Sequence, residues 1–150
     1  MLAAAGRPDA WNLPLFVHVL GAMALAGAMT AVTVLAWAGV RGSQRAVLAQ
    51  ATFWTSLAVA VPSWIVMRAG AEWIYSREHY NGHGDPNWIG IGFAVSDAGV
   101  VILLLTAGAA YWWSRRGGDG WQGRAVGVLA PLYLAALAVA WWVMTAKPHL

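Results

Sequence analysis

The chain has 150 residues, of which 60% are hydrophobic and 10% are charged, with a formal net charge of +3 and no cysteine. A typical soluble domain has about 25% charged residues, so the composition excludes an ordinary soluble protein. The lack of cysteine excludes structural disulfides, iron–sulfur clusters and thiolate metal sites.

Four apolar stretches follow one another along the chain, over residues 13–40, 46–67, 88–113 and 125–146. A helix needs about 20 mainly apolar residues to cross a hydrocarbon layer of ~30 Å at a rise of ~1.5 Å per residue. The connections between the stretches are too short to hold a second folded unit. The sequence therefore predicts an all-α fold in which residues 1–150 form a single integral membrane domain, an up-down-up-down bundle of four transmembrane helices.

The basic residues predict the orientation of this bundle. Arg41 and Arg45 flank the first linker, and the third linker contains Arg115, Arg116 and Arg124. Because Lys and Arg in short loops stay on the cytoplasmic side, we expect both termini and the 73–86 loop to be extracytoplasmic, in a multi-pass protein of the cell membrane. The arginines are interpreted as contacts for anionic lipid headgroups and not as a nucleic-acid site.

The first span contains His18, roughly 9 Å below its outer end. Ala22, Ala26 and Thr33 follow on about the same helical face. Small residues at this spacing let helices approach closely, so we expect His18 to face a neighbouring helix. One interpretation is a neutral imidazole that is hydrogen-bonded to that helix. The other is a ligand for a haem or a divalent metal, because imidazole is common in both kinds of site.

The second span and the loop after it contain further polar residues. Arg68 and Glu72 are spaced for an ion pair within one helix, and Trp64 lies one turn earlier. Pro62, inside the span, is expected to kink it. In the loop, His79 and His83 have a spacing that would place two imidazoles together for Zn or Cu in a helical turn, whereas the Asn-Gly pair at 81–82 favours a turn with solvated histidines.

Asp97 lies roughly 13 Å into the third span, on a face with Gly90, Ala94, Val101 and Gly108. An ionised group at the centre of a span costs about 2.5–3.5 kcal/mol to insert, and pairing is the cheapest way to lower that cost. We expect a partner such as Arg68 or Ser63. The alternative is a titrating group in proton or cation movement.

Eleven tryptophans, including Trp112 and Trp113 near the end of the third span, are interpreted as interfacial anchors and packing residues and not as an aromatic ligand cage.

Two segments resemble known membrane proteins. LFVHVLGAMALAG, at 15–27, and WWVMTAKPHL, at 141–150, are similar to a bacterial family of predicted integral membrane proteins of unknown function. In that family a His-Val-Leu-Gly stretch opens the first span and a Met-x-x-Lys-Pro ending closes the last, which here correspond to 18–21 and to Met144, Lys147 and Pro148. The first span also resembles copper-resistance-D-type membrane proteins, where such a histidine is suspected of metal or haem contact. The resemblance implies a compact bundle with His18 as its polar focus and no established activity.

We therefore predict a small multi-pass membrane protein in which a polar cavity in the outer leaflet binds a haem, a metal or a lipid-like ligand. The expected ligand-binding residues are His18, Trp64, Arg68, Glu72 and Asp97. The alternatives are an oligomeric component of proton- or cation-coupled transport, with membrane lipids and further copies as partners, and a structural subunit of a larger membrane complex. No nucleophile triad, phosphate loop or zincin motif is present, so a binding or structural protein is expected rather than an enzyme.

Overall fold

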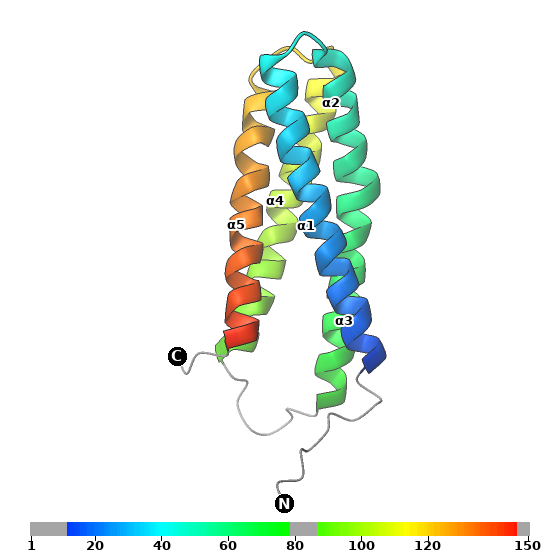
Figure 1. Ribbon diagram of the computed structural model, residues 1–150, viewed down its shortest axis with the longest axis vertical. Helices are drawn as coiled ribbons and strands as arrows, with labels where there is room; N and C mark the ends of the chain where they lie inside the picture. Colours follow the sequence, from blue (N-terminus) through cyan, green and yellow to red (C-terminus); the bar gives the residue numbers. More distant parts are fainter. Residues whose placement is uncertain (1–11, 79–86, 147–150) are drawn as a thin grey trace, which may run out of the picture.

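The computed structural model describes residues 12–78 and 87–146, which form four antiparallel helical rods (Figure 1). The rods are α1 (Asn12–Arg41), a second rod made of α2 (Arg45–Trp54), the π-helical segment η2 (Thr55–Ala60) and α3 (Val61–Glu78), then α4 (Asn87–Arg115) and α5 (Gln122–Ala146). All four are long and apolar enough to cross a membrane. The structure thus confirms the predicted all-α bundle of four spans and indicates a multi-pass membrane protein.

The second rod is longer than predicted. Its apolar stretch was expected to end at residue 67 and a loop to begin at residue 73, but α3 continues as one helix to Glu78. Arg68 and Glu72 form an i,i+4 ion pair across this extension, and pairs at that spacing support a helix even outside an apolar layer. The end of the apolar stretch shows where the second rod can leave the lipid. It does not show where the helix itself ends.

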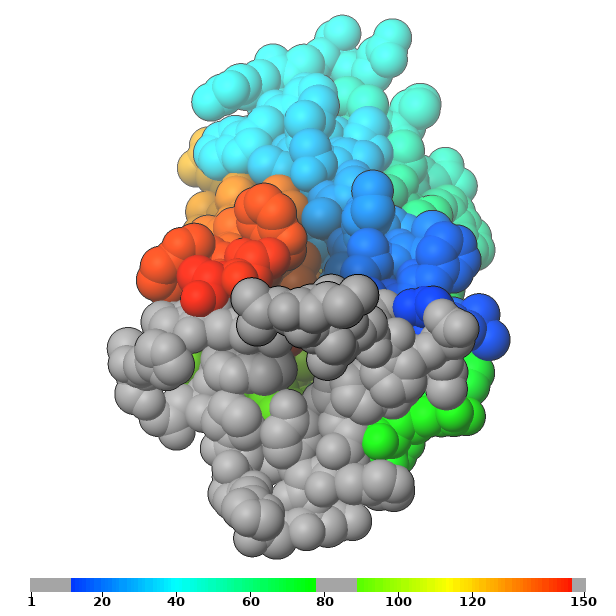
Figure 2. Space-filling view, turned by 60° about the horizontal axis from the view of Figure 1, so that its bottom comes forward, coloured from blue at the N-terminus to red at the C-terminus, as the bar shows by residue number. Residues whose placement is uncertain are grey.

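The two ends of the bundle differ in chemistry. At one end, here called the linker end, the connections 42–44 and 116–121 lie side by side, and Arg45 approaches Asp119 to 3.4 Å. At the opposite end, here called the terminal end, α1 begins and α5 finishes (Figure 1). Figure 2 brings the terminal end forward and shows the last turns of α5 and the first turns of α1 as separate parts of its surface. Both arginine-rich linkers therefore share one end, as a positive-inside orientation requires.

The turn between α4 and α5 depends on glycine. Gly117, Gly118 and Gly120 have φ values of 65°, 88° and 104°, in the left-handed region where only glycine avoids a steric penalty. The Gly118 carbonyl accepts a hydrogen bond of 2.6 Å from the indole Nε1 of Trp113. The glycine-rich linker thus forms a defined turn anchored to the last turns of α4.

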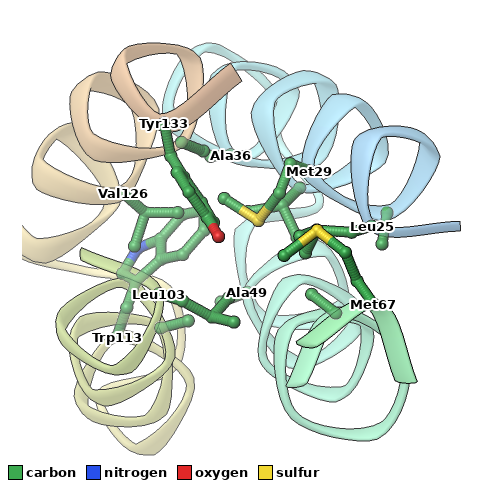
Figure 3. Packing of buried hydrophobic residues seen from close by; sticks show 14 residues of the cluster. Leu25, Met29, Ala36, Ala49, Met67, Leu103, Trp113, Val126 and Tyr133 are labelled. Atoms are coloured by element: carbon green, nitrogen blue, oxygen red, sulfur yellow. The ribbon is translucent and has the colours of Figure 1, made fainter. Parts of the chain in front are cut away.

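Trp113 is the largest side chain that is fully buried in the core (Figure 3). A Cβ placed on Gly39 of α1 or on Gly123 of α5 would come within 2.6 Å of its indole ring. Both α1 and α5 therefore have a glycine, which lacks a side chain, where they contact the Trp113 ring. Trp113, near the end of its span, is therefore a packing residue, whereas its neighbour Trp112, 59% exposed, keeps an outward position compatible with an anchor.

The kink expected at Pro62 takes the form of a wider helical turn. Proline lacks an N–H, and its ring would collide with the carbonyl four residues earlier in a regular α-helix. The preceding segment η2 relieves this crowding by π-type bonding, in which the Val61 N–H reaches the Ser56 carbonyl. Beyond it, α3 packs extensively on α1 but scarcely on α4, and the two helices diverge toward the terminal end (Figure 1).

The orientation of the bundle stays a prediction, which the lack of cysteine makes easy to test. We expect a cysteine at Ser43, in the linker end, to be protected from a membrane-impermeant maleimide added to intact cells. A cysteine at Ser76, exposed near the terminal end, should react at once. After the membrane is permeabilised, both variants should react equally; the reverse pattern in intact cells would invert the proposed topology.

Candidate functional site

The polar residues predicted to form one site occupy two places in the structure. His18 lies where α1 crosses α3. Trp64, Arg68, Glu72 and Asp97 lie together where α3 passes α4. In the described segments, no hydrogen bond or ion pair joins His18 to the charged side chains of the second group.

The crossing of α1 and α3 is a backbone-to-backbone contact made possible by two glycines. A Cβ on Gly21 of α1 would lie 2.7 Å from the Cα of Met67. A Cβ on Gly70 of α3 would lie 2.5 Å from the backbone nitrogen of His18. In a membrane the hydrophobic effect does not drive helices together, and small residues at such positions stabilise their association by allowing close van der Waals contact. This crossing fixes His18 against the backbone of α3.

The imidazole of His18 uses one nitrogen to hold this position. Its Nδ1 lies 2.8 Å from the carbonyl oxygen of Met67, and because a carbonyl can only accept, Nδ1 must donate and carry the proton. In a neutral ring, Nε2 is then the nitrogen without a proton, and it has no hydrogen-bond partner among residues 12–78 and 87–146. A histidine whose second nitrogen donates to a backbone carbonyl is oriented and made more basic as a metal ligand.

The second group is a charged cluster, here called the α3–α4 cluster, formed by Arg68, Glu72 and Asp97. The Arg68 guanidinium lies 2.8 Å from a Glu72 carboxylate oxygen and 3.3 Å from an Asp97 oxygen. The contact with Asp97 is an ion pair without hydrogen-bond alignment, because the Arg68 Nη1 that makes it has no hydrogen bond. The expected pairing of Asp97 with Arg68 is present.

Aromatic side chains bridge the same gap between α3 and α4. The Trp64 indole Nε1 donates to the Ser96 carbonyl oxygen at 3.2 Å. The Arg68 guanidinium lies over the Phe93 ring, 4.4 Å from its centre, and Tyr75 meets the same ring edge-on at 5.7 Å. Where the two backbones have separated, long side chains hold the helices together.

Asp97 points away from the interior of the bundle. Its side chain is 63% exposed and that of Glu72 is 52% exposed, whereas Arg68 is 24% exposed. Asp97 lies ten residues from the start of α4 and Arg68 ten residues from the end of α3, so each is ~15 Å from the terminal end. The cluster lies on the outside of the bundle, at the point where the apolar stretch of the second rod ends, and the arrangement does not enclose it in an interior cavity.

Tyr133 is a buried polar residue that the sequence reasoning missed. It is fully buried, and its hydroxyl is directed to the middle of the bundle without a hydrogen-bond partner in the described part of the chain (Figure 3). Gly99 of α4 leaves the space for it, since a Cβ there would lie 2.7 Å from the hydroxyl oxygen. A tyrosine far from both ends of an apolar span is the signal that could have drawn attention to it.

A metal site made by protein ligands alone is not supported by the described residues. They contain no group of three or more His, Cys, Asp or Glu side chains close enough to hold a metal ion. His79 and His83, predicted as metal ligands, lie outside the described residues, as do Lys147 and Pro148 of the C-terminal motif.

Comparison of the chain with protein families, with curated proteins and with solved structures finds no match. The resemblance of its two ends to known membrane proteins therefore stays a prediction, and function must be argued from the residues themselves.

Proposed function

We propose that this membrane protein binds a haem-type ligand through Nε2 of His18. The observation that carries the proposal is the hydrogen bond from Nδ1 to the Met67 carbonyl. In a neutral ring, this bond selects the tautomer in which Nε2 has a free lone pair, and it holds the ring in place without using that lone pair.

A single imidazole suits one class of metal ligand better than others. A bare Zn or Cu ion needs three or four protein donors, and the described residues offer no such set. A haem brings four equatorial nitrogens of its own and needs only an axial ligand from the protein. A haem bound there would supply electron transfer or the binding of small gaseous ligands, and His18 would hold and tune it.

The rest of the chain would position His18. Gly21 and Gly70 let the backbones of α1 and α3 approach closely beside His18. The Met67 carbonyl prevents the imidazole from rotating. The α3–α4 cluster is separate in this proposal, because its ion pairs do not involve His18. The transport alternative, with Asp97 as the titrating group, stays a prediction.

The proposal is tested by purifying the protein gently from its own membrane, recording its visible absorbance and measuring bound metals by elemental analysis. We expect a Soret band with about one iron per chain, lost in His18→Ala and retained in His83→Ala, the matched histidine control. A colourless, metal-free wild-type protein would overturn the proposal. Bound metal that survives His18→Ala and disappears in His83→Ala would place the site in the 79–86 loop instead.

A further inference from the structure

One face of α4 remains uncovered in the bundle and carries an unusual set of residues. The α4 outer face consists of Gly90, Ala94, Asp97, Val101, Leu104 and Gly108, all of which are exposed. Their spacing alternates between four and three residues along the helix. That is the repeat by which two helices pack along a common seam.

Three of these positions are poorly suited to contact with lipid tails. Gly90 and Gly108 have nothing within 4 Å of a Cβ placed on them, so no contact within the described chain requires glycine there. Glycine in a helix interior is less favourable than alanine by about 1 kcal/mol, and its usual benefit in a membrane is close approach of a second helix. The third position is Asp97, whose carboxylate is 63% exposed.

Asp97 is the one ionisable residue of the α4 outer face. Ionisable groups within spans face a protein interior or water and pair with one another. Asp97 lies ~15 Å from the terminal end of α4 with most of its surface uncovered by the bundle. The α3–α4 cluster contains two carboxylates and one guanidinium, so a protein surface that covers Asp97 and brings a second cation to the same depth would stabilise it.

We propose that the α4 outer face is the interface with a second copy of this chain. Two copies in one membrane have the same orientation, so a two-fold axis along the membrane normal brings α4 against α4 at equal depth. The α3–α4 cluster contains both signs of charge at that depth. Each Asp97 then meets its own Arg68 and the partner's Arg68, in a ring of two cations and two carboxylates. The face is self-complementary, as an isologous interface requires.

The glycines allow the two helices to approach until this ring is closed. Glu72 lies four residues nearer the terminal end than Arg68 and binds the same guanidinium, so its excess charge stays on the side nearest water. The proposal does not depend on the function of His18, which bonds to the Met67 carbonyl and is joined to the α3–α4 cluster by no hydrogen bond or ion pair among the described residues.

The test uses the absence of native cysteine. Single cysteines at Ala94 and Val101, on the α4 outer face, are oxidised in the native membrane at increasing lipid-to-protein ratios. The matched control is a cysteine at Leu132 of α5, which is 55% exposed. We expect disulfide-linked dimers at 94 and 101 and monomers at 132. Equal cross-linking at all three positions, or none at 94 and 101, would overturn the proposal.

A blocking variant tests the interface without disturbing the monomer. Gly108→Leu adds a side chain where the chain itself has nothing within 4 Å, so its thermal unfolding should match the parent. In the Ala94→Cys background it should lower the dimer association constant, obtained from the cross-linked fraction on lipid dilution, by about tenfold, which corresponds to ~1.4 kcal/mol. Undiminished cross-linking in this variant would also contradict the proposal.

Discussion

Replacing Trp113 with alanine is expected to destabilise the bundle more than any other single truncation. The ring is fully buried between α1 and α5, and its indole donates to the Gly118 carbonyl. We expect a loss of about 3 kcal/mol, the lower end of the range for removing a buried tryptophan, because lipid tails already provide apolar surroundings and only packing and the hydrogen bond are lost. Unfolding in mixed SDS micelles, followed by far-ultraviolet circular dichroism, measures this change.

Trp112→Ala is the matched control for this substitution. Trp112 is the adjacent residue of the same type and is 59% exposed, so its truncation leaves no cavity and should change the unfolding free energy by less than about 0.5 kcal/mol. Equal effects of the two substitutions would mean that Trp113 does not hold α1, α4 and α5 together as described.

Replacing Gly70 with alanine is expected to push α1 away from α3. The new Cβ would lie 2.5 Å from the His18 nitrogen and 2.7 Å from its Cα. These are backbone atoms, which cannot move aside as a flexible side chain can. Overpacking of this kind costs about 1–3 kcal/mol, and here it also pulls His18 from the Met67 carbonyl. We expect a lower unfolding free energy and weaker binding of the His18 ligand in the same variant.

Gly27→Ala provides the comparison for Gly70→Ala. Nothing lies within 4 Å of a Cβ at Gly27, and alanine is the better helix former by up to about 1 kcal/mol. Its stability should be unchanged or slightly raised. If Gly70→Ala behaved in the same way, the close crossing of α1 and α3 would be wrong.

The sequence was sufficient for the spans and for part of the polar site. The length of the apolar stretches alone predicts the four helices. In lipid there is no water to pair with the backbone N–H and C=O groups, and a helix pairs all of them within one segment. The pairing of Arg68 with Glu72 follows from their i,i+4 spacing. The pairing with Asp97 follows from depth, since both residues are counted from the same end of the bundle. The spacing of two residues and their distance from the end of a span can both be counted directly along the sequence.

What the sequence could not predict depends on contacts between helices. Trp113 is interior because Gly39 and Gly123, on two other helices, leave room for its ring. Asp97 faces outward because α3 has separated from α4 beyond Pro62, which no single helix reveals. His18 and the α3–α4 cluster are separated by the rotation of α3 about its axis. When a helix is apolar on every side, the sequence has no hydrophobic periodicity that shows which side faces the other helices, because every side is compatible with lipid.

Haemin titration of cofactor-free protein is the most direct test of the proposal that His18 would hold a haem through Nε2. We predict that the wild type gives the Soret band of imidazole-ligated haem, that His18→Gly does not, and that added free imidazole restores the band in His18→Gly by filling the vacated position. An unaltered Soret band in His18→Gly without imidazole, or a wild-type spectrum identical to that of haemin in empty micelles, would contradict the account.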